Sequence, residues 1–310
     1  MIIFGGIQLI LCQVPNFHKL SWLSILAAVM SFAYSLIGLG LSIAKLATEG
    51  VEAKTTTSAT VSEAERFWRI CQAIGDIAFA YAYSTVLIEI QDTLKSSPAE
   101  NKAMKHASFV GVSTTTVFYL LCGCVGYAAF REHAPGDLLS GSGFDHPVWL
   151  LNVANVCMAI HLIGAYQVFA QPIFSLVESS CRQRWPEVKF VTMDHQITIP
   201  FLGGTSFQVN WFRVVWRSAY VAVTTVFATV LPFFNVLLAL IGAASFWPLT
   251  VYFPIEMYIA RAKVLKFSFS WMCLQALSLV CLLVSLVAAA GSVAGLIQSL
   301  KTYRPFKNEV

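Results

Sequence analysis

The chain has 310 residues, of which 57% are hydrophobic and only 12% are charged, and its mean hydropathy is +0.69. Soluble domains carry about 25% charged residues because water must wet their surface, so this composition excludes a soluble globular protein. The net charge of +4 is small and no long basic block is present, so nothing indicates nucleic acid binding.

None of the eight cysteines lies in the middle of a polar segment, and six of them fall inside apolar runs. We therefore interpret them as small buried side chains rather than as a disulfide framework. The one close pair, Cys122 and Cys124, lacks the second pair that a zinc site needs, so we expect no metal. The sequence also contains no glycine-rich phosphate loop, no HExxH and no GxSxG, and we predict that the chain is not an enzyme.

Eight apolar segments follow one another along the chain, and seven of them have the ~20 residues that a helix needs to cross ~30 Å of hydrocarbon. They are Met1–Val14, Ser21–Leu46, Arg69–Leu94, His106–Phe130, Pro147–Val177, Arg213–Leu231, Phe233–Ala260 and Ser270–Ile297. The first is too short to span and lacks the features of a signal peptide, so we expect the chain to begin part-way through a helix. The predicted fold class is an all-α polytopic membrane protein with seven full spans and one truncated N-terminal span.

The distribution of lysine and arginine predicts the orientation, since cytoplasmic loops retain these residues. One set of loops holds twelve of them: Lys19, Lys95, Lys102, Lys105, Arg182, Arg184, Lys189, Arg213, Arg217, Arg261, Lys263 and Lys266. The opposite set, without the C-terminal tail, holds five: Lys45, Lys54, Arg66, Arg69 and Arg131. We therefore predict that the first set is cytoplasmic and that the acidic segment from Thr48 to Glu65 is extracellular. Only Pro232 separates the sixth segment from the seventh, which predicts a tight hairpin with an apolar tip.

The segment Arg69–Leu94 carries two carboxylic acids, Asp76 and Glu89, and an ionisable residue inside a span is a functional-site hypothesis by default. Between the acids, Ala78–Thr85 combines small and hydroxylated residues with two tyrosines. One interpretation is a discontinuous helix whose freed backbone groups bind a small zwitterion. The other is an ordinary helix that packs closely through its alanines, with both carboxylates reaching the membrane surface.

His161 lies in the middle of Pro147–Val177. Histidine changes charge between about pH 5 and 8, so His161 is a candidate proton carrier, and a structural hydrogen-bonded histidine is the alternative. In Phe233–Ala260, Pro248 and Pro254 are expected to kink the helix because they lack backbone donors. Glu256 is interpreted as a gate or interfacial ion pair with Arg261 or Lys263, or else as a solvated helix end.

Four long runs of sequence resemble the plant amino acid permeases of the amino acid/auxin permease family, in the APC superfamily. The runs begin with Gln13-Val-Pro-Asn-Phe-His-Lys, Ile74-Gly-Asp-Ile-Ala-Phe-Ala-Tyr-Ala-Tyr-Ser, His161-Leu-Ile-Gly-Ala-Tyr-Gln and Phe246-Trp-Pro-Leu-Thr-Val-Tyr-Phe-Pro. They occur in the family's order, and the resemblance covers essentially the whole chain.

The resemblance implies an eleven-helix, LeuT-type fold in which two inverted repeats each begin with a broken helix. In this mapping 1–46 is the remnant of the first repeat, 47–68 an extracellular loop, 69–260 the complete second repeat, 270–297 the final helix and 298–310 a short tail. The first three family helices would be absent.

The implied activity is proton-coupled amino acid symport by a multi-pass protein of the plasma membrane, without a cofactor other than protons as the coupling ion. The expected substrate-binding residues are Phe79, Ala80, Tyr81, Ala82, Tyr83 and Ser84. The candidates for proton coupling are Asp76, Glu89 and His161.

Alternating access moves one repeat against the other around a shared site, so we expect this chain alone to transport poorly. The expected partners are the amino acid, the lipid bilayer and a full-length permease or another copy that restores the missing helices. A different hypothesis is a non-transporting short isoform that associates with full-length permeases, and a third is a truncated gene model that gives no stable product. A channel has least support, because no segment shows a filter-like loop.

Overall fold

The computed structural model describes most of the chain as helix. The described residues are 1–14, 21–49, 62–92, 94, 97, 99–131, 134, 137–139, 144, 147–198, 206–230 and 234–302. The tip of the predicted hairpin around Pro232, most of the predicted extracellular loop and the end of the predicted tail lie outside these residues. The described chain divides into two compact units, one formed by Met1–Glu52 with Asp92–Thr229 and the other by Ala53–Gln91 with Val230–Val310.

Five of the described helices are long and apolar enough to cross a membrane: Trp22–Thr48, Glu100–Phe130, Val148–Arg184, Asn235–Ala262 and Phe269–Lys301. Each coincides with one of the seven predicted spans. Of the other two, Arg69–Leu94 is interrupted in the structure, and Arg213–Leu231 corresponds to a helix of 20 residues that carries Arg213 and Arg217. The helical, polytopic character of the prediction is therefore seen, while the number of seven spans stays a prediction.

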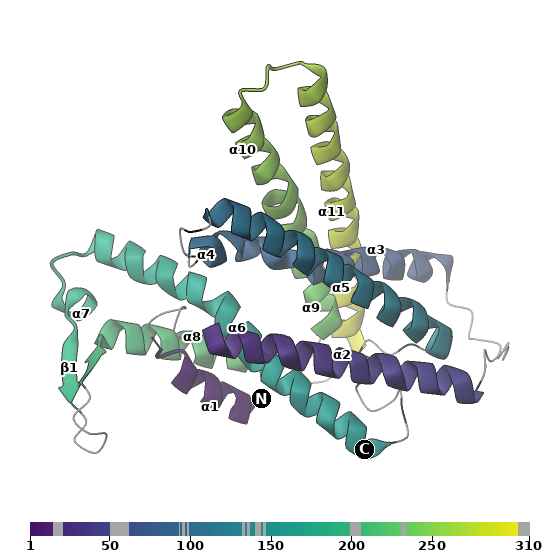
Figure 1. The fold of residues 1–310 in the computed structure, drawn as a ribbon, viewed down its shortest axis with the longest axis horizontal. Coiled ribbons are helices and arrows are strands. Elements are labelled where there is room, and N and C mark those ends of the chain that lie inside the picture. The colour runs from purple at the N-terminus through teal and green to yellow at the C-terminus, as the bar shows by residue number, and fades with distance from the viewer. Residues whose placement is uncertain are drawn as a thin grey trace. The chain divides into compact units, whose positions relative to one another are not determined.

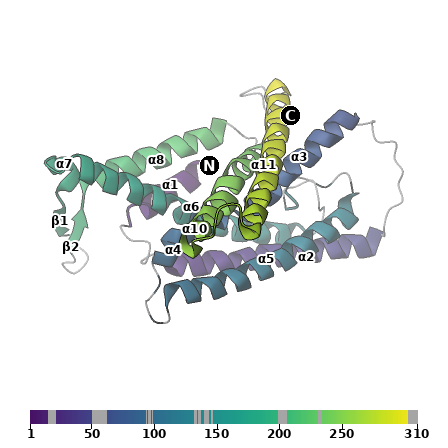
Figure 2. The same ribbon diagram turned by 90° about the horizontal axis from the view of Figure 1, so that it is seen from above.

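The first unit contains six helices among its described residues, and its packing centres on α2 and α6 (Figure 1). The elements are α1 (Ile2–Leu11), α2 (Ser21–Glu49), α5 (Glu100–Phe130), α6 (Val148–Arg184), α7 (Lys189–Thr192), β1 (His195–Thr198), β2 (Ser206–Val209) and α8 (Trp211–Val230). Gly164 of α6 brings the two main helices close, since a Cβ there would lie 2.6 Å from the Cβ of Ala27 on α2. On its other side α2 contacts α5, and Figure 2 shows α5 running along it.

Within the described residues, the structure departs from the all-helical prediction at a short antiparallel hairpin between β1 and β2, in which His195 pairs with Val209 and Thr198 with Ser206. Asn210 follows the hairpin and joins it to the next helix. Its side-chain amide donates to the carbonyl oxygens of Val191 and Met193, and its side-chain oxygen accepts from the amide of Arg213 in the first turn of α8. Asparagine is a favoured N-cap for this reason, and α8 starts directly after it.

The second unit packs α3 (Glu63–Ala80), α9 (Phe234–Ser245) and α11 (Phe269–Thr302) against one another. It also contains the 3₁₀ turn η2 (Ala82–Thr85), α4 (Leu87–Asp92), the π-helix η5 (Phe246–Tyr252) and α10 (Phe253–Ala262). Glycines make this close packing possible. A Cβ at Gly75 would lie 2.5 Å from the carbonyl oxygen of Ala239, and one at Gly291 would overlap the Cβ of Cys71. Small residues at helix contacts are the usual means by which membrane helices approach closely.

Candidate functional site

The predicted break in the segment Arg69–Leu94 is present in the second unit. The helix α3 ends at Ala80, a 3₁₀ turn follows over Ala82–Thr85, and α4 resumes at Leu87. The residues on either side of the turn, Tyr81 (φ −108°, ψ 16°) and Val86 (φ −116°, ψ 0°), lie in the sparsely populated bridge region of backbone conformations, where many active-site residues are found. The helix is therefore discontinuous rather than continuous, and its role in binding a zwitterion stays a prediction.

A second irregular segment lies against the break. The π-helix η5 runs from Phe246 to Tyr252, and the amide of Phe253 donates to the carbonyl of Pro248, five residues earlier. Proline lacks a backbone donor, which helps to explain why the regular helix gives way here. The hydroxyl oxygens of Ser84 in η2 and Thr250 in η5 are 2.8 Å apart. Short π-helical segments within α-helices occur frequently at functional sites.

The last turns of α3 are fixed against α9 by two glycines. A Cβ at Gly242 would overlap the carbonyl oxygen of Gly75 and would lie 2.5 Å from the amide nitrogen of Phe79. The backbone of α9 therefore touches the backbone of α3 within one turn of the break. This contact leaves no room for a side chain, so it fixes where the broken end of α3 lies within the unit.

The predicted substrate-binding residues Phe79, Ala80, Tyr81, Ala82, Tyr83 and Ser84 span the break, from the last residues of α3 into η2. Asp76 lies one turn before it and is half-buried, with no hydrogen bond or ion pair to any residue that the structure describes. Glu89 is exposed on α4, beyond the break. The structure thus brings the six residues and Asp76 to one place within the unit, with Glu89 on the far side of the turn.

His161 belongs to the first unit, where its Nδ1 lies 3.0 Å from the carbonyl oxygen of Ala27. Because a carbonyl oxygen only accepts, Nδ1 must carry the hydrogen in this contact. The ring of Tyr34 packs edge-on against the imidazole, with ring centres 5.6 Å apart. His161 therefore has the structural bond of the alternative interpretation, and its role in proton transfer stays a prediction.

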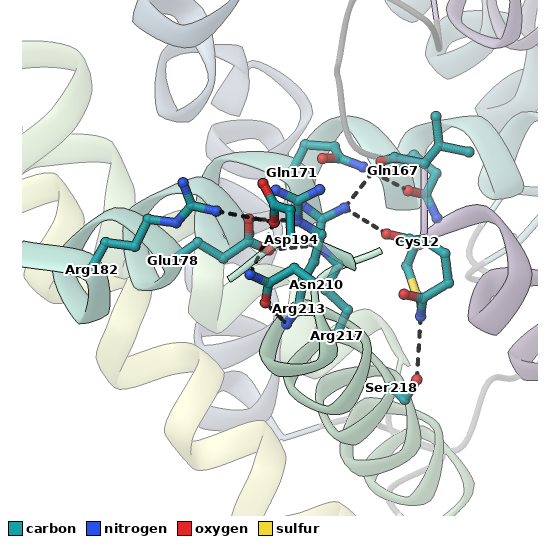
Figure 3. Close-up of polar contacts among 12 residues, drawn as sticks. Cys12, Gln167, Gln171, Glu178, Arg182, Asp194, Asn210, Arg213, Arg217 and Ser218 are labelled. Carbon is teal, nitrogen blue, oxygen red and sulfur yellow. Dashed lines mark hydrogen bonds and ion pairs between the residues drawn. The ribbon is translucent and has the colours of Figure 1, made fainter. Parts of the chain in front are cut away.

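A network of charged side chains in the first unit was not predicted from the sequence (Figure 3). Arg217 of α8 is only 2% exposed. Its Nε lies 2.6 Å from a carboxylate oxygen of Glu178 on α6, and its Nη1 donates to the carbonyl oxygens of Cys12 and Val14 at the end of α1. Arg213 reaches the same carboxylate at 3.3 Å. A helix C-terminus has unpaired carbonyls that favour a cation, so Arg217 holds three helices together.

Three glutamines form a buried chain next to this network. Gln167 of α6 donates to the side-chain oxygen of Gln8 on α1 at 2.6 Å, and Gln171 donates to Gln167 at 3.3 Å. Gln8 in turn donates to the backbone oxygen of Ile163. One face of α6 carries small and polar residues at helical spacing: Gly164, Gln167, Gln171 and Glu178. This pattern could have predicted the polar contact from the sequence.

Glu256 is paired differently from the prediction. Its carboxylate accepts a hydrogen bond of 2.8 Å from the side chain of Gln275 on α11, which joins α10 to α11. Pro254 lies in the first turn of α10, where a missing backbone donor costs little. Among the described residues, no three His, Cys, Asp or Glu side chains gather in a way that would hold a metal ion.

Comparison with known proteins decides the family. Residues 1–298 match the family described as "Transmembrane amino acid transporter protein". The chain belongs to this family of transporters. It is 62% identical to amino acid permease 1 and 65% identical to amino acid permease 6 of Arabidopsis thaliana, over 99% of the chain and over 64% and 65% of the two relatives. Amino acid permease 3 of the same plant is 53% identical over 100% of the chain and 65% of that protein. No solved structure matches the chain.

These matches confirm the predicted resemblance and the prediction that the chain is not an enzyme, because its relatives are permeases. They also support a multi-pass membrane protein, together with the five long apolar helices. The chain spans about 65% of the length of the curated relatives that it matches.

Proposed function

We propose that this chain takes part in proton-coupled symport of amino acids across the plasma membrane and that the break between α3 and α4 binds the amino acid. The observation that carries the proposal is the contact between the two irregular segments, in which Ser84 of η2 lies against Thr250 of η5. In secondary transporters, interrupted helices supply the backbone groups that bind substrates and coupling ions near the middle of the bilayer.

The break offers chemistry suited to an amino acid. The last four carbonyl groups of a helix have no partner in that helix, and the end of its dipole is partly negative. The C-terminus of α3 at Ala80 therefore suits the ammonium group of a zwitterion. The phenol groups of Tyr81 and Tyr83 and the hydroxyl of Ser84 add donors and acceptors within the next four residues.

Proton coupling is the finer part of the proposal. Asp76 has the placement that this role requires, since it lies one turn from the break on the same helix and pairs with no described side chain. His161 keeps Nε2 for proton transfer, and Glu89 would accept protons on the other side of the turn. We propose Asp76 and His161 as the principal coupling residues.

The LeuT-type arrangement of two inverted repeats is also a proposal. The second unit supplies one broken helix, and in this fold a matching broken helix belongs to the other repeat. We propose that the part of the relatives that lies outside the match supplies it. On this account the 310 residues alone transport poorly.

The experiment that tests the proposal is uptake of labelled proline and glutamate in yeast that lacks its own amino acid uptake, at acidic and at neutral external pH. The 310-residue chain is compared with a version extended by the part of amino acid permease 6 outside the match, after equal surface expression has been established. We expect acid-stimulated uptake from the extended version. Absence of uptake from both would contradict the proposal, and association of the short chain with a full-length permease without uptake would favour a regulatory role.

A further inference from the structure

A pocket of about 440 Å³ opens in the second unit, away from the break, between the first turns of α3 and the last turns of α11. This volume is within the range of small-molecule sites. The residues that line it include Glu65, Trp68, Arg69, Gln72, Gly295 and Gln298. We infer that this pocket is a second amino acid site, which binds a free amino acid with an apolar side chain. The choice of an amino acid as the ligand rests on the transport function proposed above. The geometry of the pocket is independent of that function.

The pocket holds one charge of each sign on neighbouring turns of a single helix. Nη2 of Arg69 lies 2.6 Å from Oε1 of Glu65. A guanidinium has five N–H donors and a carboxylate has two oxygens. Among the described residues, this contact therefore leaves most of the donors of Arg69 and the second oxygen of Glu65 for a ligand. A zwitterion satisfies both groups at once, with its carboxylate on Arg69 and its ammonium on Glu65. A simple anion would be repelled by the carboxylate of Glu65, and a simple cation would be repelled by the guanidinium of Arg69.

The start of α3 fixes the position of this ion pair. The hydroxyl of Ser62 accepts from the amide of Glu65, which is the N-cap that begins the helix. Trp68 stands next to the pair and is 41% exposed. An exposed indole beside a polar pair favours a ligand with an apolar side chain, because tryptophan offers a large apolar face.

The opposite wall of the pocket, on α11, contains two glycines. Gly291 and Gly295 allow α11 to approach α3, and a Cβ at Gly295 would lie 2.7 Å from the side-chain oxygen of Gln72. That oxygen is the end of a flexible side chain. An added methyl group at Gly295 would therefore push Gln72 into the pocket rather than separate the helices.

The orientation predicted from lysine and arginine places this end of α3 and the C-terminal end of α11 on the extracellular side. The pocket would then bind amino acids from the outer solution before they reach the break. Because all of its lining residues belong to the second unit, the site does not depend on the part of the relatives outside the match.

The test is binding of labelled leucine to the purified 310-residue chain by equilibrium dialysis. We expect saturable binding that weakens at least tenfold in Arg69→Gln and in Gly295→Ala, while Arg66→Gln, a nearby arginine outside the pocket, binds as the unsubstituted chain does. Thermal unfolding and gel filtration of each variant check that it is folded. Absence of saturable binding, or equal binding by Arg69→Gln and Gly295→Ala, overturns the inference.

Two analogues test the same contacts without any substitution. Leucinamide lacks the carboxylate and N-acetyl-leucine lacks the ammonium, so each is expected to bind the unsubstituted chain at least tenfold more weakly than leucine. Arg69→Gln should not weaken leucinamide binding further. Analogues that bind as tightly as leucine contradict the inference. If the extended version shows uptake but the 310-residue chain does not bind leucine, only this second site is rejected. If the 310-residue chain binds leucine but the extended version shows no uptake, only the transport function is rejected.

Discussion

The hydroxyl oxygens of Ser84 and Thr250 lie 2.8 Å apart and join a 3₁₀ turn to a π-helix. Each segment interrupts a regular α-helix within an apolar stretch. Ser84 and Thr250 are 166 positions apart along the chain. Irregular backbone at membrane depth is tolerated where it is buried in protein or lines a polar cavity. The contact therefore lies where the regular backbone hydrogen bonding of the α-helices is interrupted in this unit. It is the basis of the proposed substrate site.

A double-mutant cycle tests whether the contact between Ser84 and Thr250 contributes to the free energy of unfolding. We expect Ser84→Ala and Thr250→Ala each to destabilise the purified protein, and the double substitution to cost less than the sum. The coupling energy should be about 0.5–1.5 kcal/mol, the usual net contribution of one hydrogen bond. Chemical unfolding followed by tryptophan fluorescence measures it. Thr115→Ala is the control, because among the described residues its hydroxyl bonds only to its own helix. Strictly additive effects would argue against the contact.

Substitution of Gly242 tests the backbone contact behind the break. Gly242→Ala is expected to cost about 1–3 kcal/mol because an added methyl group meets the backbone of Gly75 and Phe79, and overpacking forces such atoms apart. Gly123→Ala is the matched control, since a Cβ there has no other group within 4 Å. Melting temperatures in one detergent compare the two. Equal melting temperatures would mean that α3 and α9 do not meet at this point.

Arg217 is expected to be far more important for stability than the exposed arginines. Arg217→Met leaves Glu178 without its closest cation and removes the donor from the carbonyls at the end of α1, and breaking a buried pair costs about 3–5 kcal/mol. The double substitution Arg217→Met with Glu178→Leu should recover part of this loss, because it removes the carboxylate that has lost its closest cation. The recovery is incomplete because Arg213 loses the same carboxylate partner. Arg182→Gln is the control, since its contact with Asp194 is 3.7 Å long and exposed. A double variant less stable than Arg217→Met would contradict this explanation.

His161→Asn separates the structural role of the histidine from proton transfer. The amide of asparagine can take the place of Nδ1 and donate to the carbonyl of Ala27, but it does not change charge between pH 5 and 8. We expect the variant of the extended chain to reach the cell surface and to lose the difference between acidic and neutral uptake. An unchanged pH profile would leave His161 with the structural role alone.

The break in Arg69–Leu94 was predictable because its cause is local. Ala78–Thr85 consists mainly of small and hydroxylated residues, which favour a continuous membrane helix only weakly, and Asp76 and Glu89 flank it. Pro248 likewise indicated a disturbance, although its form as a π-helix was not predicted, since the type of irregularity depends on how the neighbouring turns repack.

The pairing of distant residues was not predictable in the same way. Arg217 was assigned to a cytoplasmic loop set by its charge alone, and nothing in its own segment shows that Glu178 lies opposite. The contacts of Gly242 and Gly291 depend equally on which helices become neighbours. The short hairpin of β1 and β2 was missed because four-residue strands have too weak a pattern to be recognised within a polar loop.

The most direct test of the central claim is amino acid uptake by the extended chain with and without a blocked break. Ala82→Leu adds bulk to η2, and Ala107→Leu adds the same bulk to an exposed position on α5. At equal surface expression, we predict that Ala107→Leu retains acid-stimulated uptake of labelled proline and glutamate in yeast, and that Ala82→Leu loses at least nine-tenths of it, as expected if the break binds the substrate. Undiminished uptake by Ala82→Leu would contradict the account and place the substrate site elsewhere.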